Sequence, residues 1–288
     1  MYSHPILPTL LELGDAVSRN LGFVYPDDIR LSYGEETITE SNLLAIQRRH
    51  PEIVQILTFS KPQEALNGSD WEWAIIGNQL TLRMRIQAKR IDKKGSLRGL
   101  NRKAKTATLS QMDALIKGAE QEDILPVYCF YSADKHRSHW NSSADEFHYG
   151  CLIADARKIK KLKNKNFQSV ETNCVPWHFL FSKNSFERCD YWHFAASDSV
   201  RFLRRSRIRI SKKSIRLDDI KNPFTFDGRP FGTILNDSHG FDREGKLPMG
   251  LFPTSDEGLK HWLSKERDRE HPIKGIITID LRNLDHLK

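Results

Sequence analysis

The chain has 288 residues, a hydrophobic fraction of 39% and a formal net charge of +8 at pH 7. This is enough for one large folded domain or two small ones. Because no run approaches the roughly 18 apolar residues of a membrane span, and no basic segment precedes an apolar stretch at the N-terminus, we expect neither a membrane span nor a signal peptide. Four cysteines in a chain of this length are typical of a reduced protein, so we expect a cytoplasmic location.

Positive charge is concentrated in three blocks of the sequence. Arg83 to Lys105 holds ten Lys and Arg residues against one acid, while Arg157 to Lys165 holds six and Arg201 to Arg216 holds eight, both without an acid. Such blocks are typical of proteins that bind a polyanion. The alternative is a solvated surface, because 37 acidic residues offset much of the charge. We favour nucleic acid as the partner.

Helical and extended patterns alternate along the first half of the chain. The expected elements are helices at Leu10–Leu21 and from Thr37 to before His50, strands at Ile53–Phe59, Trp71–Ile76 and Leu80–Ala88, a helix at Leu109–Ala119, and a strand at Pro126–Tyr131. Thr37 and Glu40 have the spacing of a capping box at the start of the second helix. The order helix, strand, strand, strand, helix, strand predicts an α/β fold with a mixed sheet and helices on its faces.

The second half of the chain has weaker patterns. We expect strands at Tyr149–Ala154, Trp177–Phe181, Arg201–Ile210 and Gly275–Leu281, a helix at Ser255–Leu263, and loops over Asn222–Pro253. The predicted organisation is a core with an N-terminal helix over residues 1–134 and a C-terminal α+β elaboration over residues 135–288. The role of the elaboration is open, and it either stands alone or packs with the core as one domain.

Three polar residues surround the predicted turn at Gly77-Asn78. Asp70 begins the second strand, and Gln87 and Lys89 leave the same face of the third strand because they are two residues apart. A carboxylate and an amide oxygen suit Mg²⁺ or Mn²⁺, which prefer oxygen ligands. A nearby ammonium can orient an attacking water and stabilise charge on a phosphate. The trio therefore suggests phosphodiester cleavage, although each residue alone fits a turn acid or an exposed strand position.

Further residues extend this constellation. Glu36, at the start of the second helix, is the expected third metal ligand, with Glu35 as the near alternative. Gln111, in the helix that follows the basic stretch, is placed to reach the lysine or the phosphate. The basic residues expected to follow the phosphate backbone are Arg83, Arg85, Arg90, Lys93, Lys94, Arg98, Arg102, Lys103 and Lys105.

These motifs resemble a known group of enzymes. A carboxylate on one strand followed by Gln-x-Lys on the next is similar to the PD-(D/E)xK nuclease superfamily, in its Mrr-like form, and to an uncharacterised bacterial family within it. The segments that carry the resemblance, within residues 35–132, are 35–39, 67–73, 87–90, 111–116 and 125–131. The resemblance implies a restriction-endonuclease-like core, with Asp70, Gln87 and Lys89 as the catalytic trio and a helix glutamate as a further ligand.

The predicted function is therefore that of a metal-dependent endonuclease-like hydrolase acting on DNA, with bacterial defence as the role that the resemblance suggests. Gln87 stands where an acid is more usual, which keeps open a catalytically inactive nucleic-acid-binding protein on the same fold. A partner- or ligand-activated effector is a further alternative. The sequence also leaves a homo-oligomer open.

A second cluster consists of two Cys-x3-His spacings, Cys174 with His178 and Cys189 with His193. Two cysteines and two histidines can hold a structural zinc ion. The order differs from the usual Cys-x2-Cys and His-x3-His, and the segment around His178 has the pattern of a buried strand. The sequence therefore favours a buried histidine over a zinc ligand.

Overall fold

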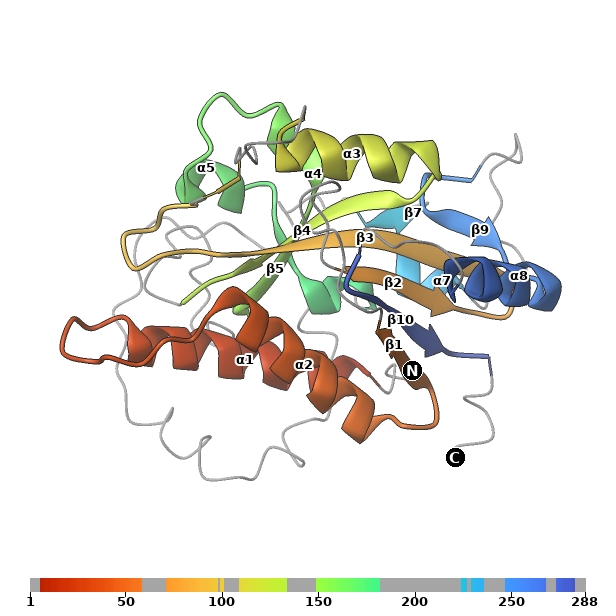
Figure 1. Ribbon diagram of the computed structural model, residues 1–288, viewed down its shortest axis with the longest axis horizontal. Helices are drawn as coiled ribbons and strands as arrows, with labels where there is room; N and C mark the ends of the chain where they lie inside the picture. The colour runs from red at the N-terminus through yellow and green to blue at the C-terminus, as the bar shows by residue number, and fades with distance from the viewer. Residues whose placement is uncertain are drawn as a thin grey trace.

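The computed structural model of this chain shows a mixed α/β fold, in which helices cover both faces of an eight-stranded sheet (Figure 1). The predicted α/β class is thus confirmed. The residues that the structure describes are 6–58, 71–97, 99–100, 109–133, 149–181, 224–226, 229–235, 247–267 and 273–282. Among them, no helix is long and apolar enough to cross a membrane.

The helices and strands follow the order expected from the sequence over the first half of the chain. The helices are α1 (Leu7–Val24), α2 (Glu35–Arg49), α3 (Gln111–Gln121), α4 (Ala156–Lys160), α5 (Phe167–Glu171), the 3-10 helix η3 (Trp177–Leu180), α7 (Phe231–Ile234) and α8 (Asp256–Arg267). The strands are β1 (Val54–Thr58), β2 (Trp71–Ile76), β3 (Leu80–Arg90), β4 (Leu125–Tyr131), β5 (Cys151–Asp155), β6 (Val175–Pro176), β7 (Thr225–Phe226), β8 (Arg229–Pro230), β9 (Leu251–Pro253) and β10 (Gly275–Asp280).

The sheet combines strands from both halves of the chain. Its order is β1-β10-β2-β3-β4-β5-β6, with β9 paired to β3. The C-terminal strand β10 lies between β1 and β2, antiparallel to the first and parallel to the second. β2 and β3 form the predicted hairpin, and β4 runs parallel to β3 after the α3 crossover. The shared sheet favours the one-domain alternative over a separate C-terminal unit.

Each face of the sheet has its own hydrophobic core. Leu10, Ile38 and Ile46 of α1 and α2 pack with Met84 and Ala88 of β3 on one face. On the other face, the apolar residues of α3 pack with alternate residues of β4 and β5, namely Met112, Leu115, Ile116, Tyr128, Phe130, Leu152 and Ala154. Figure 1 shows α1 and α2 on one side of the sheet and α3 to α5 on the other. Both faces of β3 are therefore covered, whereas its alternating sequence suggested one exposed face.

A buried ion-pair cluster accompanies this double coverage. The carboxylate of Glu72 on β2 is fully buried and accepts hydrogen bonds from Arg83 at 2.6 Å and from Arg85 at 3.2 Å. Arg85 also donates to Glu122 at 3.1 Å, and the guanidinium of Arg83 lies 4.4 Å from the ring centroid of Trp262. The two arginines thus neutralise a buried carboxylate, which is a different role from the phosphate contacts expected for them.

Three local expectations are corrected by the structure. The second helix begins at Glu35 with Gly34 as its N-cap, so the predicted cap Thr37 lies inside the first turn; acidic side chains there suit the helix dipole. The expected strand at Trp177–Phe181 is instead the 3-10 helix η3, and the indole of Trp177 donates to the Leu10 carbonyl at 2.7 Å. The segment 222–253, expected as loops, contains the short elements β7, β8, α7 and β9.

Replacing Glu72 by alanine is expected to lower the free energy of unfolding by about 3–5 kcal/mol, because two arginines then lack a buried countercharge. The matched control is Glu12→Ala, since Glu12 forms an exposed ion pair with Arg49. That change should cost only about 0–1 kcal/mol. Urea unfolding of both variants at neutral pH measures the difference. Equal costs would show that the buried cluster does not stabilise the fold.

Candidate functional site

The candidate site lies where β3 continues past the end of β2. Trp71, the first residue of β2, pairs with Ile86, while Gln87 to Arg90 continue in register with β4. β10 begins at the same end of the sheet, because Gly275 pairs with Trp71. The N-terminus of α2 lies there too, since the Arg90 backbone N–H donates to Glu35 Oε2 at 2.8 Å. Several chain segments thus bring polar residues to one end of the sheet.

Lys89 and Glu35 are the central charged pair of this site. Lys89 is 8% exposed, and its Nζ lies 3.6 Å from Glu35 Oε1. The second oxygen of Glu35 accepts the hydrogen bond from the Arg90 backbone, so the carboxylate bridges the helix and the strand. The Arg90 guanidinium in turn donates to the Tyr33 carbonyl at 3.1 Å, just ahead of α2. The ammonium of Lys89 is therefore held in a largely water-excluded position beside one carboxylate.

Gln87 presents a buried oxygen without a protein partner. Its side chain is 2% exposed, and among the described residues Oε1 has no hydrogen-bond partner. Its register partner on β4 is Tyr128, whose hydroxyl also has no partner within the described part of the chain, and burial raises the pKa of this phenol well above its usual value. Because buried polar atoms are nearly always paired, an acceptor that has no partner among the described residues is available to a ligand.

The two glutamates that begin α2 point to different partners. Glu36 is exposed and forms an ion pair with Lys274, immediately before β10. Hydrogen bonding and the charge of Lys274 lower the pKa of Glu36. Glu35, in contrast, contacts Lys89. Of the two helix carboxylates considered from the sequence, the geometry thus favours Glu35, the alternative, over Glu36.

Gln111 is the first residue of α3 and is half-buried. The far end of α3 is fixed near the middle of β3, where Glu122 contacts Arg85. The helix therefore points its N-terminus toward the end of β3 that carries Lys89. No contact of Gln111 with Gln87 or Lys89 is present among the described residues, so its predicted role stays a prediction.

Several predicted site residues lie outside the described part of the chain. These are Asp70, Arg98, Arg102, Lys103, Lys105, Cys189 and His193. Of the predicted zinc ligands, Cys174 and His178 are both buried, and the Cys174 thiol donates to the Val170 carbonyl at 3.3 Å. A zinc cluster with Cys189 and His193, which the sequence disfavours, falls outside the described residues. Arg90, Lys93 and Lys94 of the basic block line a cavity beside the site.

The oxygen atoms at the site fit a divalent cation in part. Among the described residues, no three His, Cys, Asp or Glu side chains come together as a metal site. The described donors are the Glu35 carboxylate and the unpartnered Gln87 oxygen. Asp70 directly precedes Trp71 in the chain, and a trans peptide keeps neighbouring Cα atoms about 3.8 Å apart. Trp71 pairs with Ile86, the residue before Gln87, and the predicted ligand Asp70 itself lies outside the described residues.

The sequence does not point to two residues near the site. Its pattern places Tyr128 in a buried strand, and the parallel pairing of β3 with β4 is what sets Tyr128 beside Gln87. Lys274 comes from the other end of the chain, and nothing in the first 132 residues signals it.

The chain belongs to a protein family described as a family of unknown function, DUF6615, because residues 12–273 match the model of that family. A search of curated proteins gives no match.

Replacing Gln87 by leucine is expected to raise the free energy of unfolding by about 1 kcal/mol, because the change removes a buried acceptor that has no partner. The control is Gln55→Leu on β1, where the side chain is exposed and no such gain is expected. Urea unfolding in the presence of a chelator measures both. A clear loss of stability in Gln87→Leu would mean that Gln87 serves the fold instead of a ligand.

Proposed function

We propose that this member of a family without an assigned activity is a metal-dependent nuclease that hydrolyses phosphodiester bonds, with DNA as the expected substrate. One observation carries the proposal. A buried lysine, paired with a helix carboxylate, shares one strand face with a buried amide oxygen that has no partner among the described residues, at the end of the sheet where β2 begins. A lysine that served the fold alone would not require such an acceptor two residues away.

The arrangement of elements supports a restriction-endonuclease-like core made of α2, β1, β2, β3, α3 and β4. β2, β3 and β4, which carry or adjoin the site, are direct neighbours in the sheet. β10 separates β1 from β2, but β1 carries none of the proposed site residues. The C-terminal strand thus enlarges the sheet without entering the hairpin and crossover that position Gln87 and Lys89.

Glu35, Gln87 and Asp70 are the residues that would hold the cation, and all three offer oxygen atoms, as Mg²⁺ and Mn²⁺ prefer. Such a cation would supply Lewis-acid polarisation of a phosphoryl oxygen. Two of these ligands would be anionic and one neutral, so the site would still favour a divalent cation over a monovalent one. Glu36 is left out of this ligand set because it contacts Lys274 ahead of β10, whereas Glu35 contacts Lys89 on the strand that carries Gln87.

Among the protein side chains, Lys89 is the one proposed to act on the water and the phosphate during hydrolysis. Its ammonium can donate hydrogen bonds to an attacking water and to the phosphate oxygens on which charge develops. Because the side chain is 8% exposed, its charge acts in surroundings of lower dielectric than water, where such stabilisation is stronger. Glu35 holds the ammonium in place through the 3.6 Å contact and is itself fixed by the Arg90 backbone. The positioning is thus built in before a substrate arrives.

Incubating the protein with plasmid DNA and Mn²⁺ is expected to give cleavage that falls about 10²–10³-fold in Lys89→Met, the size of effect seen when one preorganised stabilising group is removed. Asp70→Asn should have an effect of similar size through loss of a ligand. Glu35→Gln should reduce cleavage more strongly than Glu36→Gln, because only Glu35 contacts Lys89. Gel analysis of initial rates measures all four variants.

The control for charge is Lys117→Ala, on the exposed side of α3, which should cleave like the wild type. Equal cleavage by wild type, Lys89→Met and Asp70→Asn would indicate a contaminating nuclease and refute the proposal. Tight DNA binding by the wild type without cleavage in any divalent metal would favour the inactive nucleic-acid-binding alternative. Cleavage that appears only after addition of cell extract would favour the partner-activated alternative.

A further inference from the structure

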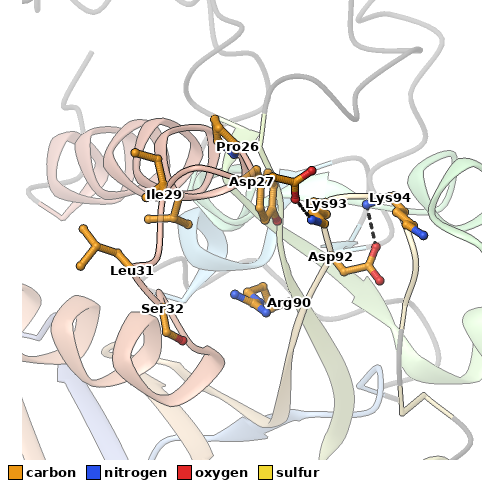
Figure 2. Close-up of a pocket in the computed structure, with 11 residues that line it drawn as sticks. Pro26, Asp27, Ile29, Leu31, Ser32, Arg90, Asp92, Lys93 and Lys94 are labelled. Carbon is orange, nitrogen blue, oxygen red and sulfur yellow. Dashed lines mark hydrogen bonds and ion pairs between the residues drawn. The ribbon is translucent and has the colours of Figure 1, made fainter.

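A cavity of about 410 Å³ adjoins the lysine site. It lies between the segment that links α1 to α2 and the chain that follows β3, as Figure 2 shows. Tyr25, Ile29 and Leu31 line it from the first segment, and Arg90, Lys93 and Lys94 line it from the second. Its volume is within the range of about 300–1,000 Å³ typical of small-ligand sites.

The two walls of the cavity differ in chemistry. The first wall is largely apolar, and its residue Leu31 is 67% exposed. The second wall carries the cations. Tyr25 also lines the cavity: its hydroxyl donates to the Ile91 carbonyl, and burial raises its pKa to about 12, so it remains a neutral phenol. A ligand that fits both walls combines an apolar part with a negative charge.

The acids around the cavity are engaged by other groups. Asp27 forms an ion pair with Lys93, and the Asp92 carboxylate accepts hydrogen bonds from the backbone N–H groups of Lys94 and Ser96. The guanidinium of Arg90, however, is held by a neutral acceptor, the Tyr33 carbonyl. Arg90 therefore keeps its positive charge available toward the cavity, into which its side chain projects in Figure 2.

Arg90 and Glu35 link the cavity to the proposed catalytic lysine. Arg90 lines the cavity, its backbone N–H contacts Glu35 at 2.8 Å, and Glu35 contacts Lys89. A group bound in the cavity would thus lie one residue along β3 from the ammonium. Arg90 and Lys89 are consecutive residues of β3, so their side chains leave opposite faces of the strand, and the Glu35 carboxylate is the contact that they share.

We infer that this cavity binds an unpaired nucleotide of the substrate strand, at the same end of β3 as Lys89. The inference rests on the proposed nuclease function and adds its substrate class. The base would lie against Ile29 and Leu31, and its phosphate against Arg90 and Lys94. A base within a duplex must leave the stack to enter such a cavity, at a cost in unpairing energy. Single-stranded nucleic acid is therefore the preferred ligand.

The test is a binding measurement with a fluorescently labelled short oligothymidylate, single-stranded or annealed to its complement, in a chelator so that no cleavage is required. The wild type should bind the single strand more tightly than the duplex. Leu31→Ala should raise the single-strand Kd about fivefold through lost apolar contact. Arg90→Ala should raise it about tenfold or more through a lost phosphate contact and should weaken its salt dependence.

Matched controls separate the cavity from the general surface. Leu44→Ala removes a leucine of similar exposure, 56%, from α2, and Lys117→Ala removes an exposed cation from α3. Both should bind the single strand like the wild type. Equal effects of Leu31→Ala and Leu44→Ala, or equal affinity of the wild type for duplex and single strand, would overturn the inference. Because Leu31 is exposed, its replacement should leave the fold intact. The comparison of Leu31→Ala with Leu44→Ala therefore tests the inference even if Arg90→Ala disturbs the fold.

Two further outcomes distinguish the inference from the proposal beneath it. If the cavity variants weaken single-strand binding while no protein cleaves plasmid, the nucleotide site stands and the nuclease proposal fails. If the wild type cleaves and both cavity variants bind and cleave equally well, the nuclease proposal stands and the inference fails. Thymidine 5′-monophosphate alone should compete weakly; if it binds more tightly than the oligonucleotide, the ligand is a free nucleotide and the strand assignment is overturned.

Discussion

Burial of both faces of β3 is the constraint on which the rest of the structure depends. α1 and α2 cover one face and α3 the other, so the polar residues that alternate along this strand cannot all reach water. Arg83 and Arg85 form ion pairs with Glu72 on the neighbouring strand, although the buried Nε of Arg85 has no partner among the described residues. Lys89 is satisfied by Glu35 from the helix end. Gln87 lies between these two charged groups and is the one whose acceptor has no partner among the described residues.

The end of the sheet is the natural place for such a site. Inside the sheet, β2 and β4 flank β3, and a charged side chain there needs a protein countercharge, as Arg85 shows. Beyond Ile86, pairing with β2 stops, and the N-terminus of α2 approaches instead. A helix N-terminus favours negative charge, which suits both Glu35 and the phosphate that the proposal places nearby. The end of strand pairing and the favourable charge of the helix N-terminus thus both point to the region around Lys89 and Glu35.

Much of the first half could be predicted from the sequence because its signals are local. The alternation of Leu80 to Ala88 and the turn at Gly77-Asn78 correctly predicted the hairpin. Long-range contacts could not be predicted in the same way. Nothing in the sequence of β10 shows that it inserts between β1 and β2, and the choice between Glu35 and Glu36 depends on helix rotation, which the capping pattern at Thr37 placed wrongly. Likewise, period-two polarity cannot tell an exposed strand face from one covered by a helix.

The same ambiguity explains why charge alone was a poor guide to binding residues. Arg83 and Arg85 belong to the most basic block of the sequence, yet they neutralise Glu72, whereas Arg90 and Lys94 of the same block line a cavity. The two groups differ in whether a buried carboxylate, such as Glu72 of the neighbouring strand, lies within reach of the cation. Where such a partner is present, a cation stabilises the fold; where the chain leaves the sheet and carboxylates are bound by other groups, its charge remains for a ligand. The amide oxygen of Gln87, on the same strand, has no partner among the described residues. We interpret it, like Arg90 and Lys94, as a group that serves a ligand, because folding alone would favour an apolar side chain at this position.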